Sequence, residues 1–272
     1  MKTRIITGII LIPLLVLILI SNTTLITLAI IAVSLIGLYE FYKATQLSQK
    51  RALCLVGYAA GIVIPLLKST FNPAWDFSLL WQLLIYVFIF ALFIIMLAQH
   101  KTVSVTDAAM VIFSVIYIPY FLTHLLLIRH LENGAFLIWL PFLGAFSTDT
   151  FAYFTGFFLG KHKLCPEISP KKTIEGAIGG TVGCMVIVLL FGLCMEKFLH
   201  ADVNYIRFGI LGILCAVISQ IGDLTASIIK RKFGIKDYGN LFPGHGGILD
   251  RLDSVIAVAP LVYIYLNTVG IR

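Results

Sequence analysis

The chain has 272 residues, of which 60% are hydrophobic and only 12% are charged, and its mean hydropathy is +1.00. Soluble domains carry about 25% charged residues, so this composition excludes a soluble protein and indicates that lipid is the solvent. The net charge of +7 fits loops that face an anionic membrane surface. It does not indicate nucleic-acid binding, because the basic residues do not form one long solvated run.

Long apolar runs follow one another along the chain. A membrane-spanning helix needs about 20 mostly apolar residues, and the sequence predicts about nine such segments. We therefore expect an all-α fold, a polytopic membrane bundle that forms one domain over residues 1–272, with N-terminal spans in 1–134 and catalytic spans in 135–272. The predicted spans are 5–20, 25–42, 52–67, 79–98, 108–128, 135–159, 174–198, 206–229 and 252–266.

The distribution of basic residues predicts the orientation. If the N-terminus is cytoplasmic and the spans alternate, most of the 20 lysine and arginine residues fall in cytoplasmic loops. This bias agrees with the positive-inside rule. The two most polar loops, 160–173 and 230–251, then lie on the cytoplasmic side.

Four acidic residues lie within or beside apolar runs: Asp149, Asp223, Asp250 and Asp253. An ionised carboxylate near the bilayer centre costs at least about 2.5–3.5 kcal/mol, so it usually faces a cavity or a partner. Asp250 and Asp253 are three residues apart, which places them on one helix face, where they repel each other unless a cation lies between them. The acids therefore either hold a hard cation such as Mg²⁺ or form Asp–Lys and Asp–Arg pairs that join helices.

Two basic segments could bind phosphate. Lys171 and Lys172 precede a helix expected to begin near Thr173, whose hydroxyl can cap it, and a helix N-terminus favours an anion. The small residues 176–180 then permit close helix packing. The second segment carries Lys230, Arg231, Lys232 and Lys236 and leads into the glycine-rich stretch 243–247. Carboxylates for a metal and basic residues for phosphate together indicate metal-assisted phosphoryl or nucleotidyl transfer.

The polar segment 227–253 closely resembles the signature of phosphatidate cytidylyltransferases, also called CDP-diacylglycerol synthases. Residues 147–153 and 169–176 resemble a second region of that family, except that Ile174 stands where an aromatic residue is usual. Leu38 to Glu40 also resembles the family. The residues that carry the main resemblance are Ser227, Lys230, Arg231, Lys236, Asp237, Gly239, Phe242, Pro243, His245, Gly246, Gly247, Asp250, Arg251 and Asp253.

The resemblance implies an enzyme that forms CDP-diacylglycerol and pyrophosphate from CTP and phosphatidic acid, with Mg²⁺. We expect a bacterial plasma (inner) membrane rather than an organellar one, because the sequence shows no long extra-membrane extension, and the distribution of basic residues predicts an active site that faces the cytoplasm. A homodimer is a further expectation. The first-choice metal ligands are Asp223 and Asp250, and the second choices are Asp149 and Asp253. Catalytic roles are expected for Asp223, Asp250, Lys230 and Arg231. Substrate binding is expected for Ser169, Lys171, Lys172, Thr173, Ser227, Lys236, His245, Gly246, Gly247 and Arg251.

Three other functions are compatible with parts of the pattern. A CDP-alcohol phosphatidyltransferase would have its next acid four residues after Asp250, whereas here it is Asp253, and the leading half of that motif is absent. A CTP-dependent lipid kinase is chemically closer, but residues 230–253 argue against it. A cation-coupled transporter also needs intramembrane acids, but such proteins usually contain internal repeats, and none is evident.

Overall fold

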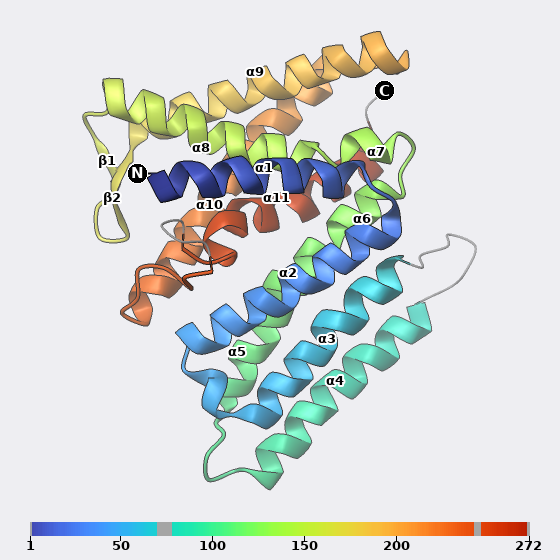
Figure 1. Ribbon diagram of the computed structural model, residues 1–272, viewed down its shortest axis with the longest axis vertical. Coiled ribbons are helices and arrows are strands. Elements are labelled where there is room, and N and C mark those ends of the chain that lie inside the picture. Colours follow the sequence, from blue (N-terminus) through green and yellow to red (C-terminus); the bar gives the residue numbers. More distant parts are fainter. Residues whose placement is uncertain (1, 70–77, 242–245, 271–272) are drawn as a thin grey trace. The chain divides into compact units, whose positions relative to one another are not determined.

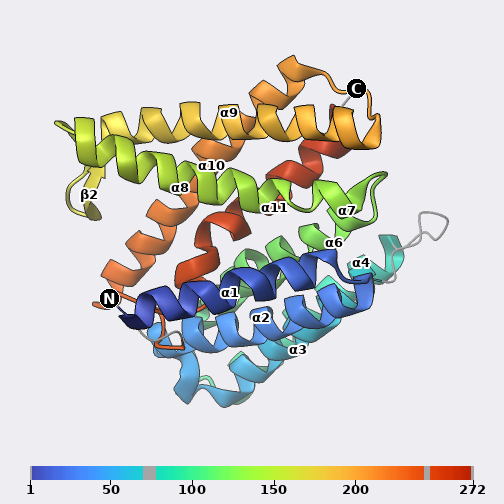
Figure 2. The same cartoon turned by 45° about the horizontal axis from the view of Figure 1, so that its top comes forward.

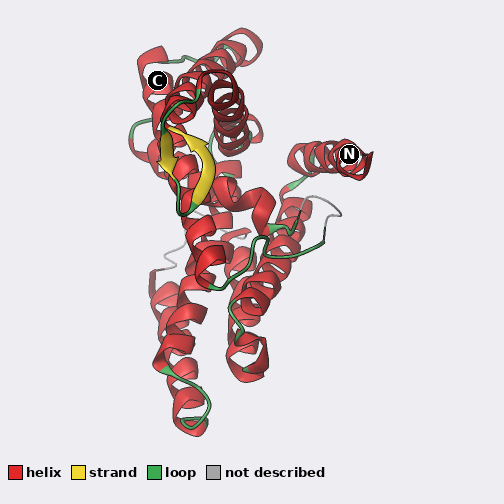
Figure 3. Ribbon diagram, turned by 90° about the vertical axis from the view of Figure 1, so that its left-hand side faces the viewer, coloured by secondary structure: helices red, strands yellow, loops and turns green. Residues whose placement is uncertain are grey.

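The computed structural model describes residues 2–69, 78–241 and 246–270 and divides the chain into two compact units. Unit 1 comprises Met1–Leu127 and Asp237–Leu249, and unit 2 comprises Ile128–Lys236 and Asp250–Arg272. Among the described residues, the regular secondary structure is helical apart from a short hairpin in unit 2, and loops join the elements, as Figures 1 and 3 show. This confirms the predicted all-α membrane class.

Unit 1 is built from consecutive helices in which α2 packs on α3, and α3 packs on α4 and α5 (Figure 1). The Asn22 side chain caps α2 by accepting a bond of 2.9 Å from the Leu25 amide. Ser104 and Asp107 form a reciprocal capping box at the start of α5, which satisfies two backbone donors. The elements are α1 Lys2–Ile20, α2 Thr23–Ala44, η1 Leu47–Gln49, α3 Arg51–Ser69, α4 Ser78–Ala98, α5 Val105–Val115 and the π-helix η2 Ile116–Tyr120.

Unit 2 has long helices of which α9 packs along both α8 and α10; Figures 1 and 2 show α8 and α9 side by side. Two helices cross the boundary between the units: α6 His124–Arg129, and α11, whose first residue Leu249 belongs to unit 1. The other elements of unit 2 are α7 Gly134–Leu137, α8 Leu140–Leu159, β1 Lys163–Cys165, β2 Ser169–Thr173, α9 Ile174–Leu199 and α10 Tyr205–Lys232.

Small residues on α9 bring it close to α8, as the sequence predicted. A Cβ atom added at Gly176 would lie 2.8 Å from the Ala152 carbonyl oxygen, and one added at Gly180 would lie 2.9 Å from the Thr148 carbonyl oxygen. Side chains at these glycines would push the helices apart. Close backbone approach is a common way for helices to pack in lipid, where water provides no driving force between apolar faces.

The segment between α8 and α9 differs from the predicted loop, because β1 and β2 pair antiparallel, with Lys163 opposite Thr173 (Figure 3). The Glu175 carboxylate reinforces the hairpin by accepting bonds from the Lys161 and His162 amides. Local pairing of this kind satisfies backbone groups in the connection between the two helices. The predicted cap is confirmed: the Thr173 hydroxyl accepts a bond of 3.1 Å from the Gly176 amide at the start of α9.

Each predicted span coincides with helical structure. Within the described residues, seven helices are long and apolar enough to cross a membrane. They are Thr23–Ala44, Arg51–Ser69, Leu79–Ala98, Val105–Arg129, Gly134–Leu159, Ile174–Leu199 and Tyr205–Lys232. The predicted number of about nine spans needs α1 and α11 to cross the membrane as well, and it stays a prediction. The cytoplasmic N-terminus, which was inferred from charge, also stays a prediction.

Candidate functional site

The acid of α10 is paired with a lysine of the hairpin. The Lys172 Nζ atom on β2 lies 2.5 Å from the Asp223 Oδ2 atom, and both side chains are about one quarter exposed. One turn further along α10, the Ser227 hydroxyl donates a long bond of 3.5 Å to Asp223 Oδ1. The hairpin therefore brings one predicted phosphate-binding lysine onto one predicted metal ligand.

The acid at the start of α11 is paired in the same way. The Lys230 ammonium, near the end of α10, donates a bond of 2.8 Å to the Asp250 Oδ1 atom. This pair is more deeply buried, with side-chain exposures of 11% for Lys230 and 3% for Asp250. Burial of a single charge of this kind would be costly, so each partner needs the other or a substitute of the same charge.

The helices α10 and α11 approach each other closely at this point. A Cβ atom added at Gly222 would lie 2.6 Å from the Ala257 Cβ atom and 3.2 Å from the Asp253 carbonyl oxygen. The glycine thus allows α11 to lie against α10 beside Asp223. Asp253 itself is buried, and its carboxylate accepts a bond of 2.7 Å from the Ser254 amide.

Charge interactions join the remaining acids to these pairs. Asp149, which is on α8, interacts electrostatically with Asp223, Lys172 and Arg251. Asp253 interacts with Asp223, Lys230 and Asp149. The four predicted acids therefore share one electrostatic environment with two lysines. We call this set the acid–base cluster: Asp149, Lys172, Asp223, Lys230, Asp250 and Asp253.

Carboxylates that are hard oxygen donors suit Mg²⁺ by their chemistry. The buried hydroxyl of Ser219, one turn before Asp223, has no hydrogen-bond partner within the described part of the chain and adds another oxygen donor to this face. The donor types therefore fit the ion. As the acids are placed, however, no three His, Cys, Asp or Glu side chains among the described residues are grouped closely enough to hold a metal. Lysine ammonium groups contact Asp223 and Asp250 instead.

The other predicted binding residues of unit 2 are mostly exposed. Lys171, Lys236 and Arg251 are exposed, and Ser169 opens β2. Arg231 is also exposed, and its Nη1 atom donates a bond of 3.2 Å to the Ile235 carbonyl oxygen. The four exposed basic side chains are therefore accessible to an anion.

The glycine-rich stretch is only partly described. His245 was expected to bind substrate, and it lies outside the described residues, as do Pro243 and Gly244. Gly246 adopts a left-handed φ of 84°, a conformation that favours glycine. Gly247 packs against the carboxylate of Glu40 within unit 1.

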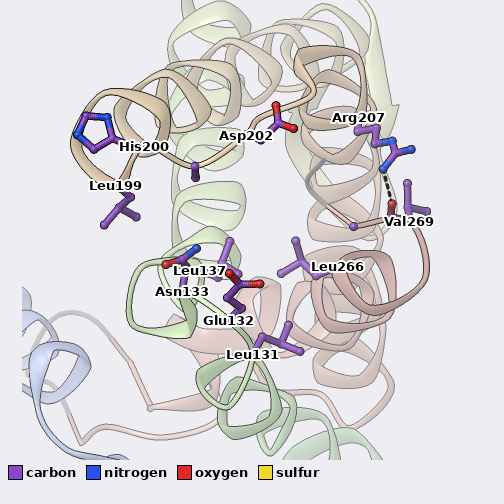
Figure 4. Close-up of a pocket in the computed structure, with 12 residues that line it drawn as sticks. Leu131, Glu132, Asn133, Leu137, Leu199, His200, Asp202, Arg207, Leu266 and Val269 are labelled. Atoms are coloured by element: carbon purple, nitrogen blue, oxygen red, sulfur yellow. Dashed lines mark hydrogen bonds between the residues drawn. The ribbon is translucent and has the colours of Figure 1, made fainter.

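Two hollows lie on unit 2. One, of about 620 Å³, is lined by Glu132, Asp202 and Arg207 among others, and the Arg207 Nη1 atom donates a bond of 2.7 Å to the Val269 carbonyl oxygen (Figure 4). In the described part of the chain, no member of the acid–base cluster lines it. The second, of about 400 Å³, is almost entirely apolar and lies between α9 and α10. We call it the α9–α10 groove, lined by Leu164, Ile174, Ala177, Ile178, Thr181, Val182, Val217, Gln220, Ile221 and Leu224.

Comparison with known proteins decides the family. A family model described as "Cytidylyltransferase family" matches residues 2–269. The chain belongs to the cytidylyltransferase family.

Curated relatives with similar sequences carry the name phosphatidate cytidylyltransferase. The protein of Bacillus subtilis is 32% identical over 98% of this chain and 97% of the relative. The protein of Staphylococcus haemolyticus is 36% identical over 98% of this chain and 99% of the relative. That of Haemophilus influenzae is 43% identical over 47% of this chain and 44% of its own length. The predicted resemblance is confirmed, as is the prediction that the chain is an enzyme of this class.

One residue of this cytidylyltransferase received no role from the sequence. Glu40 was noted only as part of a short resemblance, yet its carboxylate is buried and bonded to backbone amides of residues 248 and 249. The available signal was an acid near the end of the predicted span 25–42.

Proposed function

We propose that this chain transfers CMP from CTP to phosphatidic acid, giving CDP-diacylglycerol and pyrophosphate. The names of the full-length relatives support this reaction. The observation that carries it is the pairing of Lys172 with Asp223 and of Lys230 with Asp250 in one cluster. The cluster combines lysines that can bind phosphate with carboxylates that can bind a cation.

The proposed step exchanges one phosphoanhydride bond for another. An oxygen of the lipid phosphate attacks the α-phosphorus of CTP and forms a new P–O bond. The bond from that phosphorus to the oxygen bridging to the β-phosphorus breaks, and pyrophosphate leaves with the electron pair. The lipid phosphate is already ionised at neutral pH, so the reaction needs no nucleophilic side chain and no covalent nucleotidyl-enzyme.

The basic side chains would neutralise the negative charge that the two substrates bring together. Lys172 and Lys230 are held beside carboxylates, and a phosphate oxygen can replace a carboxylate as the partner of an ammonium group. Lys171 and Arg231, which are exposed, would contact phosphate oxygens from the outer side. Fixed positive groups at the place where charge develops stabilise the transition state.

The acids released from the lysines would hold Mg²⁺. Asp223 and Asp250 are the proposed ligands, with Asp149 and Asp253 as further ligands or as groups that orient them. A bound Mg²⁺ supplies positive charge to phosphate oxygens and favours the departure of pyrophosphate. Asp–Lys pairs that only join helices would have the same geometry, and the activities of Asp223→Asn and Asp250→Asn distinguish the two roles.

The α9–α10 groove supports a lipid substrate. It begins at Ile174 and Leu224, which are close in sequence to Lys172 and Asp223, and its lining is apolar. We propose that an acyl chain of phosphatidic acid lies in the groove while the phosphate reaches Lys172. We also propose that the cluster faces the cytoplasm of a bacterial cell, where CTP is available, as the distribution of basic residues predicts.

The test uses the purified full-length protein in detergent with phosphatidic acid, Mg²⁺ and CTP that carries label in its α-phosphate. Label should enter a chloroform-soluble product and depend on both phosphatidic acid and Mg²⁺. The absence of labelled lipid would overturn the proposal.

A second labelling position distinguishes this reaction from that of a lipid kinase. Label in the γ-phosphate of CTP should remain in the aqueous phase as pyrophosphate. If γ-label enters the lipid when diacylglycerol replaces phosphatidic acid, the chain is a CTP-dependent kinase instead.

A further inference from the structure

Unit 1 contains a buried acid that takes no direct part in the proposed reaction. Glu40, on α2, is 4% exposed. Its Oε1 atom accepts a bond of 3.0 Å from the Ile248 amide, and its Oε2 atom accepts one of 3.0 Å from the Leu249 amide. The two oxygens of one carboxylate therefore hold two consecutive backbone donors.

These donors lie at the start of α11, which begins at Leu249. The first amides of a helix have no partner within the helix, and a negative charge there also interacts favourably with the helix dipole. Glu40 provides both from a helix that is 208 residues away in sequence. Asp250 is the next residue of α11, and Asp253 follows within the same turn.

The preceding segment fits closely around the same carboxylate. A Cβ atom added at Gly239 would lie 2.5 Å from Glu40 Oε1, and one added at Gly247 would collide with both carboxylate oxygens. The Tyr238 ring stacks on Phe41, the neighbour of Glu40, with ring centroids 6.4 Å apart. A side chain at either position would therefore displace the Glu40 carboxylate.

We propose that Glu40 is a positioning residue for nucleotidyl transfer. Its carboxylate determines the residue at which α11 begins and thereby the turn of that helix from which Asp250 and Asp253 project. This inference rests on the proposed function of those two acids. It also explains why a charged residue is buried here. Helix packing alone does not require the charge, since an apolar side chain at this position of α2 could be buried at a lower cost in free energy.

The test compares the full-length protein with the variant Glu40→Gln, which keeps the shape but replaces one accepting oxygen with a donating amide. Hydrogen exchange of the backbone amides at 248–253 should become about tenfold faster, while exchange in α3 and α9 stays unchanged. The kcat for CMP transfer should fall by about 10–100-fold, as for other residues that orient ligands. The Mg²⁺ concentration for half-maximal activity should rise, and the KM for CTP should change less than twofold.

The Mg²⁺ dependence separates positioning from a simple loss of folded protein, because a smaller active fraction does not alter it. Unchanged local exchange, unchanged Mg²⁺ dependence, or a uniform rise in exchange along the whole chain would each overturn the inference. Glu196→Gln, a change at an exposed acid of α9, serves as the control and should match the wild type.

If Glu40→Gln cannot be purified, Gly239→Ala provides the same test, because its added Cβ pushes against Glu40 without changing the charge. The same measurements then decide. A wild-type protein that transfers no CMP would defeat the proposed function, whereas the exchange measurement on Glu40 remains readable in that case.

Discussion

At the scale of single residues, the two Asp–Lys pairs have two interpretations that mutation can separate. A pair that only joins helices contributes stability, and either partner can be removed with a similar effect. A pair that releases its acid to a cation and its lysine to a phosphate contributes to turnover, and the two partners then have different kinetic effects. Lys230 and Asp250 suit this test well, because both are buried and removal of either would leave the charge of the other in a costly environment.

We expect Asp223→Asn and Asp250→Asn to abolish CMP transfer while the protein stays inserted in the membrane. Asp250→Asn should also lower the thermal midpoint, because the buried Lys230 loses this carboxylate. Asparagine keeps the shape of the side chain but removes the charge that a hard cation needs. The measurement is turnover together with the thermal midpoint in detergent. Asp202→Asn, at an exposed acid of unit 2, is the control. Full activity in either variant would remove that residue from the proposed metal site.

We expect Lys172→Ala to act mainly on nucleotide binding and to raise the KM for CTP. The variant removes a positive charge that lies 2.5 Å from Asp223 and is available to the triphosphate. The KM for CTP is measured at saturating phosphatidic acid. Lys163→Ala, an exposed lysine of the same hairpin, should leave the KM unchanged. An equal KM in Lys172→Ala and the wild type would refute this role.

At the scale of elements, close contact between helices depends on particular glycines. A Cβ atom added at Gly212 on α10 would lie 2.7 Å from the Met185 Cα atom of α9, whereas one added at Gly209 would lie 3.9 Å from the nearest atom, in the Leu189 side chain. The two glycines are on one helix and three residues apart. They form a matched pair for testing the α9–α10 contact.

We expect Gly212→Ala to destabilise the protein by about 1–3 kcal/mol, because backbone atoms cannot move aside as a flexible side chain can. Gly209→Ala should be neutral or slightly stabilising, since alanine favours helix more than glycine does. Thermal midpoints in the same detergent measure both. Equal midpoints for the two variants would contradict the described packing.

The α9–α10 groove gives a second prediction at this scale. We expect Ile178→Trp, which fills the groove, to raise the KM for phosphatidic acid with little change in the KM for CTP. Leu190→Trp places the same bulk on the same helix outside the groove, and it should behave as the wild type. If both variants respond alike, the groove does not bind the lipid.

At the scale of the whole molecule, the orientation in the membrane remains a prediction from charge. In a cysteine-free background, we expect Lys163→Cys to react with a membrane-impermeant maleimide only from the cytoplasmic side. Asp202→Cys, between α9 and α10, should react only from the opposite side. Labelling of intact cells and of inverted vesicles distinguishes the two. The reverse pattern would place the acid–base cluster away from CTP and contradict the proposed function.

Much of the fold could be predicted because the signals are local. A helix in lipid must satisfy its own backbone hydrogen bonds, so an apolar run of sufficient length identifies it without knowledge of its neighbours. The Thr173 cap and the small residues of α9 are equally local and were predicted correctly. The β1–β2 hairpin was missed because its strands are short and polar and carry little periodicity.

The sequence by itself determined the membrane class, the helical segments and the chemical types at the candidate site. It identified acids and lysines as exceptional because lipid opposes every charge. Only the tertiary structure decided which acid meets which lysine and that Glu40 holds the start of α11. The physical reason is that a charge within a span is recognisable in the sequence as a group that needs a partner in lipid. The identity of that partner depends on which helices pack together. No local pattern records a hydrogen bond between residues 208 positions apart.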